Sequence, residues 1–309
     1  MAGIWRDEML HERFADLTQL LKAGELFWRH HAFQMLRLPW EAEFPQMART
    51  LRALSLDTAE RLARSDQALL GFLSEHLPWC SVILDCCEIG EFAATPLPDI
   101  EPRDIPGRKW QQIRHFVPHI PANDLAVLEW CSGKAHMGRT LVQQRGCAVS
   151  ALEYDARLIE EGEALAAREQ VAIDFHCVDA MGPSASTLIR EKQNVVALHA
   201  CGDLHAQMLR LAARAHTATV TLAPCCYHLV GEHSRSVISA AAKASGLQLS
   251  RDDLRTAVHG TMTAAARQVC RRQQLQAWRL GFDLLQRDVR GGDEYLPTPS
   301  LPLSELDKG

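Results

Sequence analysis

The stretch LEWCSGKAHMGRTL, residues 128–141, decides the fold. Apolar residues typical of a buried strand lead into small residues and then into a helical pattern. The stretch is not a P-loop, because Lys134 directly follows Gly133 and precedes Gly138. The dinucleotide pattern G-x-G-x-x-G is nearly met, with Ala135 in place of the middle glycine. A strand, a tight loop and a helix in this order predict a ligand-binding turn at the edge of a parallel sheet.

From about residue 110, short runs rich in Val, Ile and Leu alternate with amphipathic stretches. The expected strands are Leu125–Leu128, Ala148–Leu152, Ala172–Val178, Asn194–His199 and Ala218–Leu222. The expected helices are Gly138–Arg145, Ala156–Glu169, Ser184–Lys192 and Leu204–Ala215, with Gly146 as a C-cap of the first. This alternation predicts an α/β fold, a doubly wound, mostly parallel, Rossmann-like sheet covered by helices on both faces.

The chain divides into three expected parts. Residues 1–90 are expected to form a helical N-terminal domain, with a capping box formed by Asp57 and Glu60 at the start of a helix that continues to Leu77. Residues 91–107 carry four prolines and no apolar periodicity, which predicts a linker or a long loop. Residues 108–309 are expected to form the ligand-binding domain. Within them, Thr263–Arg287 is expected to be one long helix, and the proline-rich tail an edge strand or a loose segment.

The composition is that of an ordinary soluble protein, with 47% hydrophobic and 23% charged residues in 309. A net charge of −5 argues against a broad nucleic-acid surface but leaves local basic patches open. Such patches occur at residues 101–115, with four cations against two carboxylates, and at 251–272, with five arginines against two aspartates. Ten cysteines and an N-terminus charged too early for a signal peptide predict reduced thiols in the cytoplasm, and no apolar run is long enough to span a membrane.

Acidic residues follow three of the expected strands at their carboxyl ends: Glu129, Glu153 and Asp179. An acid about 20 residues past a glycine loop binds ribose hydroxyls in dinucleotide sites, and a ribose ligand suits NAD and S-adenosylmethionine equally. Glu129 would repel a pyrophosphate beside it, whereas it could stabilise the ammonium and sulfonium of S-adenosylmethionine. Asp179 could accept a hydrogen bond from the adenine amino group. The acids therefore favour a cationic nucleoside without phosphate, and NAD is the alternative.

Two further segments, ALHACGDLH at 197–205 and APCCYH at 223–228, follow the fourth and fifth strands. Three interpretations of them compete. Zinc or an iron–sulfur cluster is one, disfavoured because there is no C-x-x-C pair and adjacent cysteines rarely ligate one ion together. Packing of small buried thiols is the second. The third, which we favour, is chemistry on the methyl acceptor, which needs a group that removes a proton. The expected catalytic or acceptor-positioning residues are His199, Asp203, Cys225, Cys226, Tyr227 and His228, and no metal site is expected.

The motifs EWCSGKAHMG, ALHACGDL and APCCYH resemble a subgroup of S-adenosylmethionine-dependent methyltransferases. This subgroup includes the methyltransferase-like 25 group, the glutathione S-transferase C-terminal domain-containing protein and a class of tRNA 2′-O-methyltransferases. The motifs occur in the same order over roughly residues 107–275. One departure is Ala135, which stands where the family usually has glycine and so bears on cofactor affinity.

The resemblance implies a methyltransferase with S-adenosylmethionine as its cofactor. It implies a substrate-binding role for Lys109 in the segment GRKWQQIRHF. The acceptor is expected to be RNA, tRNA or rRNA, with a protein or small-molecule acceptor, or a non-catalytic sensor of S-adenosylmethionine, as alternatives. The cofactor-binding residues expected from the acids, the loop and the resemblance together are Glu129, Ser132, Gly133, Lys134, Ala135, Gly138, Glu153 and Asp179.

Overall fold

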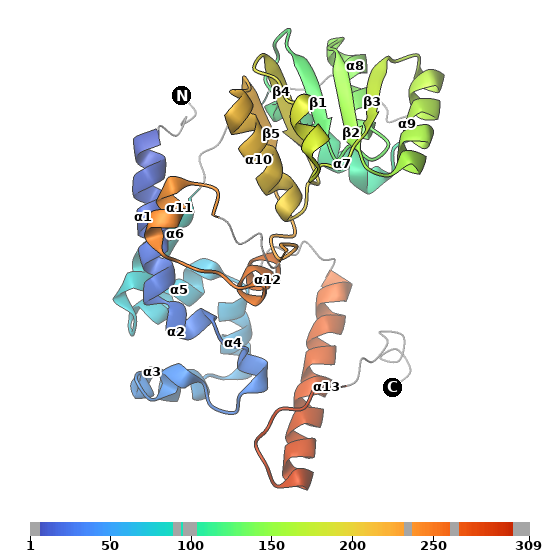
Figure 1. Cartoon of the computed structure of the whole chain (residues 1–309). Helices are drawn as coiled ribbons and strands as arrows, with labels where there is room; N and C mark the ends of the chain where they lie inside the picture. Colours follow the sequence, from blue (N-terminus) through green and yellow to red (C-terminus); the bar gives the residue numbers. More distant parts are fainter. Residues whose placement is uncertain (1–6, 89–93, 95–103, 232–236, 260–265, 299–309) are drawn as a thin grey trace. The chain divides into compact units, whose positions relative to one another are not determined.

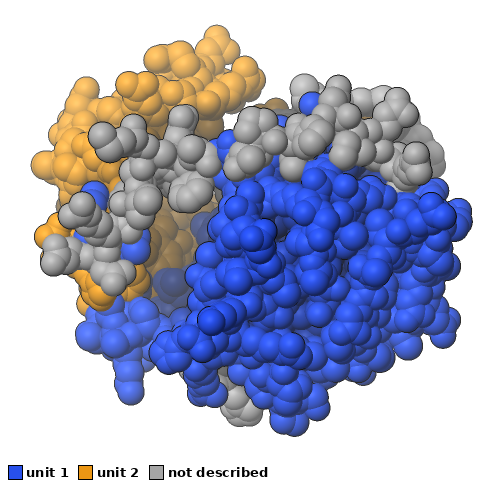
Figure 2. All heavy atoms as spheres, turned by 90° about the horizontal axis from the view of Figure 1, so that it is seen from above, with its two compact units in different colours: residues 1–10, 89–259 blue, residues 11–88, 260–309 orange. Residues whose placement is uncertain are grey.

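The structure is a computed structural model of the whole chain (Figure 1), and it describes residues 7–88, 94, 104–231, 237–259 and 266–298. The chain forms two compact units (Figure 2). One unit comprises residues 1–10 and 89–259, and the other comprises residues 11–88 and 260–309. Residues 260–309, which we expected to belong with the sheet, are therefore grouped with the N-terminal helices.

The first unit contains a five-stranded parallel sheet in the order β3-β2-β1-β4-β5. Its strands are β1 Ala126–Trp130, β2 Val149–Glu153, β3 Ile173–Cys177, β4 Gln193–Ala197 and β5 Thr219–Leu222. Its helices are α7 Gly107–Phe116, α8 His136–Arg145, α9 Ala156–Glu169, α10 Asp203–Ala215, α11 Ala240–Ser245 and α12 Arg251–His259, with 3-10 turns η4 Val117–His119 and η5 Pro183–Thr187. The strand order changes direction between β1 and β4, which makes their carboxyl ends the expected ligand site.

Both faces of the sheet are covered, which confirms the predicted fold class (Figure 1). Successive residues of a strand point to opposite faces. In β1, Leu128 and Trp130 pack with α10 residues such as Met208, whereas Val127 packs with α7 and α8 residues such as Leu141. The central strand β4 is buried along its whole length, as expected for a strand covered on both faces.

The expected helix over residues 184–192 is wrong, because only the short 3-10 turn η5 forms there. In this turn the side chains of Ser186 and Thr187 donate hydrogen bonds to the carbonyl oxygens of Pro183 and Ser184. Such bonds from hydroxyl groups compete with the regular helical pattern. Gly146 ends α8 with a φ of +62°, as predicted.

The second unit is helical in its described residues. It contains α2 Glu25–Trp28, α3 Pro45–Arg52, α4 Leu56–Ala63, α5 Asp66–Ser74, α6 Ile83–Cys87 and α13 Ala266–Arg290, with 3-10 turns η1 Ala32–Gln34, η2 Pro39–Glu41 and η3 Pro78–Val82. Helix α1, Asp7–Ala23, begins before residue 11 and continues into this unit. The expected helix from Asp57 to Leu77 is two helices, because Ser65 accepts a hydrogen bond from Ala68 N and starts α5 anew. The N-cap of α4 is Ser55, not the predicted Asp57.

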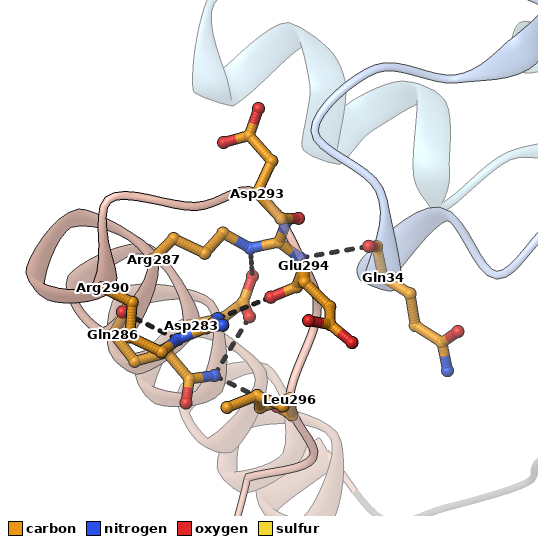
Figure 3. A network of polar contacts seen from close by, with 8 residues as sticks. All are labelled: Gln34, Asp283, Gln286, Arg287, Arg290, Asp293, Glu294 and Leu296. Atoms are coloured by element: carbon orange, nitrogen blue, oxygen red, sulfur yellow. Dashed lines mark hydrogen bonds and ion pairs between the residues drawn. The ribbon is translucent and has the colours of Figure 1, made fainter.

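Arg287 of helix α13 forms a buried ion pair within the helix and joins the helix to the N-terminal part of its unit (Figure 3). Arg287 Nε donates to Asp283 Oδ2 over 2.8 Å, and Arg287 Nη2 donates to Gln34 O over 3.1 Å. The long helix expected over residues 263–287 is confirmed where it is described. Most of the expected linker 91–107, and the tail from residue 299, lie outside the described residues.

Candidate functional site at the carboxyl ends of the strands

The loop between β1 and α8 has an unusual backbone. Cys131, Gly133 and Ala135 have φ values of +56°, +58° and +49°. A left-handed conformation is costly for residues other than glycine and is maintained only where the surroundings enforce it. Here Ser132 N donates to Leu152 O over 2.9 Å, so the loop is fixed to the end of the neighbouring strand β2. Residues 131–135 thus form the tight turn that the sequence predicted.

Glu129 lies beneath this loop, with only 5% of its surface exposed. Its Oε2 accepts a hydrogen bond from Gly138 N over 2.8 Å. A Cβ atom on Gly138 would lie 2.6 Å from the same oxygen, which explains why a glycine is needed there. Burial raises the pKa of Glu129 to about 7, although the Gly138 N–H and the charge of Lys109 lower it. Glu129 therefore holds the start of α8, and its carboxyl is largely shielded from solvent.

Glu153 and Asp179 remain at the rim. Glu153 Oε2 accepts from Gly133 N over 2.8 Å, and its Oε1 accepts from Tyr154 N and Asp155 N over 2.9 and 3.1 Å. Three backbone donors thus orient one carboxylate against the loop. Asp179 is exposed, and its Oδ1 accepts from Met181 N over 2.9 Å. Burial, together with the charges of Glu153 and Asp179, raises the pKa of Cys131 to about 12. Both carboxylates therefore lie close enough to act on the same thiol.

Two lysines occupy different places from those expected. Lys134 forms an ion pair with Glu161 of α9, so its side chain is directed along that helix. Lys109, expected on the substrate side, lies at the loop instead. Its Nζ is 3.9 Å from where a Cβ on Gly133 would stand. Its charge lowers the pKa of His136, which burial mainly brings to about 4. The ammonium group of Lys109 therefore lies close to the loop at Gly133.

The polar atoms of the loop include one with no protein partner. Ser132 Oγ is buried and forms no hydrogen bond with any described residue. A buried hydroxyl without a partner is costly, and a bound ligand is one way to satisfy it. The side chain of Ala135 is fully buried, and its Cβ lies 3.7 Å from the position of a Cβ on Gly138. Its methyl group therefore packs inside the loop and does not line the ligand side.

The fourth and fifth strand ends are joined by backbone contacts. Cys201 pairs with Cys225 in an isolated parallel bridge, and Gly202 N donates to Cys225 O over 3.2 Å. Asp203 N donates to Leu229 O over 3.1 Å, and Asp203 Oδ2 accepts from Gly231 N over 2.7 Å. The motifs at 197–205 and 223–228 therefore come together, as predicted, and Asp203 is used to hold the second motif in place.

His199 is the exposed group of this edge that is best able to exchange a proton. Its Nε2 lies 3.1 Å from Gln112 Oε1 on α7. Burial of part of the ring lowers its pKa, and the charges of Lys109 and Arg108 lower it further. The ring is therefore neutral near pH 7. Gln112 was missed in the sequence, although it lies one helical turn after Arg108 in the segment that contains Lys109.

Tyr227 and His228 lie beside this edge but differ in exposure. Tyr227 is 38% exposed, and its ring meets that of His205 edge-on, with 6.0 Å between centroids. His228 Nδ1 is buried and has no hydrogen-bond partner among the described residues. The ring of Tyr227 is thus partly exposed at this edge.

Comparison with known families decides the class of this site. The family model described as "Methyltransferase domain" matches residues 108–233. Residues 108–233 are therefore similar to a methyltransferase domain. The methyl donor of this domain is S-adenosylmethionine. The match covers the glycine loop, both acids at the rim and the two motifs at the ends of β4 and β5.

Solved structures of low similarity include an S-adenosylmethionine-dependent methyltransferase from Clostridium acetobutylicum (13% identity, 39% of this chain and 48% of that one, TM-score 0.26). Others are a precorrin-6y C5,15-methyltransferase from Geobacter metallireducens (11%, 36% and 59%, 0.28) and a fibrillarin/Nop5p complex (21%, 29% and 44%, 0.26). The chain spans 44–59% of the length of these proteins. No curated protein matches the chain. Among the described helices, none has the length and apolar character needed to cross a membrane.

The loop fits S-adenosylmethionine. The unpartnered hydroxyl of Ser132 can bond a polar group of the donor, and the bare Cα of Gly133 allows close approach to the backbone. The rim offers carboxylates to a ligand that carries positive charge and ribose hydroxyls. Glu129 is only about half ionised at pH 7, so the preference for a cation over a pyrophosphate depends mainly on Glu153 and Asp179.

Proposed function

We propose that the chain is an S-adenosylmethionine-dependent methyltransferase whose acceptor is RNA, tRNA or rRNA. The observation that carries the proposal is the position of Arg108 and Lys109 in the first turn of α7. Both charges act on His199 at the edge where methyl transfer takes place. Cations at the mouth of a site attract the phosphates of a nucleic acid, even on a chain with net charge −5. The resemblance to tRNA-modifying relatives supports the same acceptor.

On the donor side we assign roles to four residues. Glu153 binds the ribose hydroxyls, because the backbone already fixes its carboxylate against the loop. Asp179 accepts the adenine amino group. Ser132 and Lys109 bind the donor's amino-acid portion, because the hydroxyl lacks a partner and the ammonium lies over Gly133. We therefore assign Lys109 to the donor side of the site and Arg108 to the acceptor side.

On the acceptor side the chain has to position a nucleotide and remove a proton. When bound, S-adenosylmethionine supplies an electrophilic methyl group. His199 is neutral near pH 7 and can take the proton that the acceptor loses, while Gln112 fixes the orientation of the ring. Tyr227 can stack on a base. Alignment of the reacting atoms contributes on the order of 7–11 kcal/mol to lowering such a barrier, so positioning residues are as important as the base.

The test is incubation with tritiated S-adenosylmethionine and an extract of cells that lack the protein, followed by separation of RNA, protein and metabolites. We expect the label in RNA. Arg108→Ala should reduce RNA labelling and weaken its dependence on salt, whereas Arg157→Ala, an exposed arginine of α9, should leave both unchanged. Label in protein would overturn the RNA acceptor, and donor binding without label in any fraction would favour a sensor.

A small-molecule acceptor is the second candidate, because an apolar cavity adjoins the same edge. Its volume of 610 Å³ lies within the range of roughly 300–1,000 Å³ that is typical of small-molecule sites. Asp203, Tyr227, Ala242 and Leu254 are among its lining residues. Label in the metabolite fraction that is lost on Ala242→Trp, a substitution that fills the cavity, would support this acceptor. Unchanged RNA labelling in the same variant would support RNA as the acceptor.

A further inference from the structure

Three cysteine thiols converge where β4 and β5 end. Cys201 follows β4, and Cys225 and Cys226 follow β5. The Sγ atoms of Cys201 and Cys225 are 3.0 Å apart, and the three Sγ atoms all lie within 4.8 Å of one another. All three residues are half-buried. The cluster combines residues that are 24 positions apart in the chain, so the sequence alone does not show that they meet.

The backbone around the thiols is built to hold them. Gly202 has a φ of +54°, and a Cβ atom there would stand 1.8 Å from Leu229 O. Cys226 itself has a φ of +48°, a left-handed conformation that is costly for a cysteine. Leu229 N closes the turn by donating to Cys226 O over 2.9 Å. A strained residue that its surroundings enforce points to a function for the side chain it carries.

The geometry of the thiols suits a shared cation better than packing or a single disulfide. Sulfur ligands at about 2.3 Å from a tetrahedral zinc ion lie roughly 3.8 Å from one another. The Cys201–Cys225 separation of 3.0 Å is shorter than that value, and all three Sγ atoms lie within 4.8 Å of one another, so a small adjustment of the side chains would bring them to the distances of a shared ion. A disulfide between Cys201 and Cys225 would leave the Cys226 thiol unexplained.

We propose that Cys201, Cys225 and Cys226 bind one Zn²⁺ ion through three thiolates. Soft thiolate ligands select ions of this kind, and each thiol releases its proton to solvent on binding. Three protein ligands leave a fourth position open, as in sites that bind water or a substrate atom. The expectation of no metal was based on the absence of a C-x-x-C pair and on the rarity with which adjacent cysteines ligate one ion. Cys201, which follows β4, adds a ligand from a second segment that this spacing argument did not include. The site does not depend on the identity of the methyl acceptor.

The test uses the full chain, reduced with a phosphine and freed of metal, with Zn²⁺ added in competition with a chromophoric chelator. We expect one equivalent to bind tightly with release of about three protons. Co²⁺ in place of Zn²⁺ should give the intense visible bands of tetrahedral thiolate coordination. Cys201→Ser and Cys225→Ser should each weaken binding by more than about 100-fold, because even loss of an outer-shell partner can weaken binding 10–100-fold.

The matched control is the double variant Cys86→Ser with Cys87→Ser, which removes an adjacent cysteine pair from α6 in the other unit. It should keep the full affinity for Zn²⁺. Far-ultraviolet circular dichroism of each metal-free variant checks that the fold is intact. Absence of tight binding, equal loss in the control, or a Cys201–Cys225 disulfide whose reduction gives no Zn²⁺ binding would overturn the proposal. None of these readouts involves S-adenosylmethionine or RNA, so failure here leaves the proposed function standing.

Discussion

Glu129→Gln should make the sheet unit more stable at alkaline pH. The carboxyl of Glu129 is buried, and its pKa in the folded protein is about 7 against an ordinary value of 4.5. Because the folded pKa is raised, the stability that this group contributes is complete below about pH 4.5 and is lost as the pH rises through 7. A shift of this size corresponds to about 3 kcal/mol of unfolding free energy.

Glutamine keeps the shape of the side chain and an oxygen that can accept from Gly138 N, but it does not ionise. The variant should therefore exceed the wild type by about 3 kcal/mol at pH 8 and by less than about 1 kcal/mol at pH 5. Hydrogen exchange of the peptide that spans β1 and α8, measured in rising urea, reports this unit alone. Glu163→Gln, an exposed residue of α9, is the control and should show no such dependence on pH. An equal difference at pH 5 and pH 8, or a variant less stable than the wild type at pH 8, would refute the reasoning.

Three other substitutions test the loop and the proton acceptor. Gly138→Ala should destabilise the same unit by roughly 2–4 kcal/mol in the urea measurement, because its Cβ would stand 2.6 Å from Glu129 Oε2, and an unchanged stability would contradict this contact. Ala135→Gly should change the stability of the same unit by less than about 0.5 kcal/mol in the urea measurement, because relief of a left-handed alanine, about 1 kcal/mol, offsets loss of a buried methyl group, about 0.8 kcal/mol, and a larger change would contradict this balance. His199→Ala should lower kcat by about 10²–10⁴-fold without weakening donor binding. The lowered pKa of His199 places the acid limb of the wild-type rate profile below pH 6.5, and a limb above that value would remove His199 as the base.

The parallel sheet could be predicted from the sequence because the signal is local. Each strand is a short run of β-branched and apolar residues, and the helices between them have caps or apolar faces that the sequence shows directly. The expected helix over residues 184–192 failed where Ser186 and Thr187 bond the backbone with their hydroxyl groups. The grouping of residues 260–309 with residues 11–88 depends on contacts between distant segments, such as Arg287 with Gln34, that leave no pattern in the sequence.

The sequence predicts which residues belong to the candidate site, but it does not predict how their side chains are arranged. The ends of parallel strands meet at one edge, so Glu153, Asp179 and His199 could be placed there from topology alone. Which side chain faces a ligand depends on packing. Lys134 pairs with Glu161, and Glu129 lies beneath α8. The approach of Cys201 to Cys225 depends likewise on a turn that only the folded chain shows.

Calorimetric titration of the wild type and Glu153→Ala with S-adenosylmethionine, its demethylated product and NAD tests the central claim most directly. The account predicts that the donor and its product bind at one site per chain and that NAD does not bind. It also predicts that Glu153→Ala weakens donor binding by more than about 1.4 kcal/mol, a tenfold change. Binding of NAD in place of the donor, or donor affinity unchanged in Glu153→Ala, would contradict it.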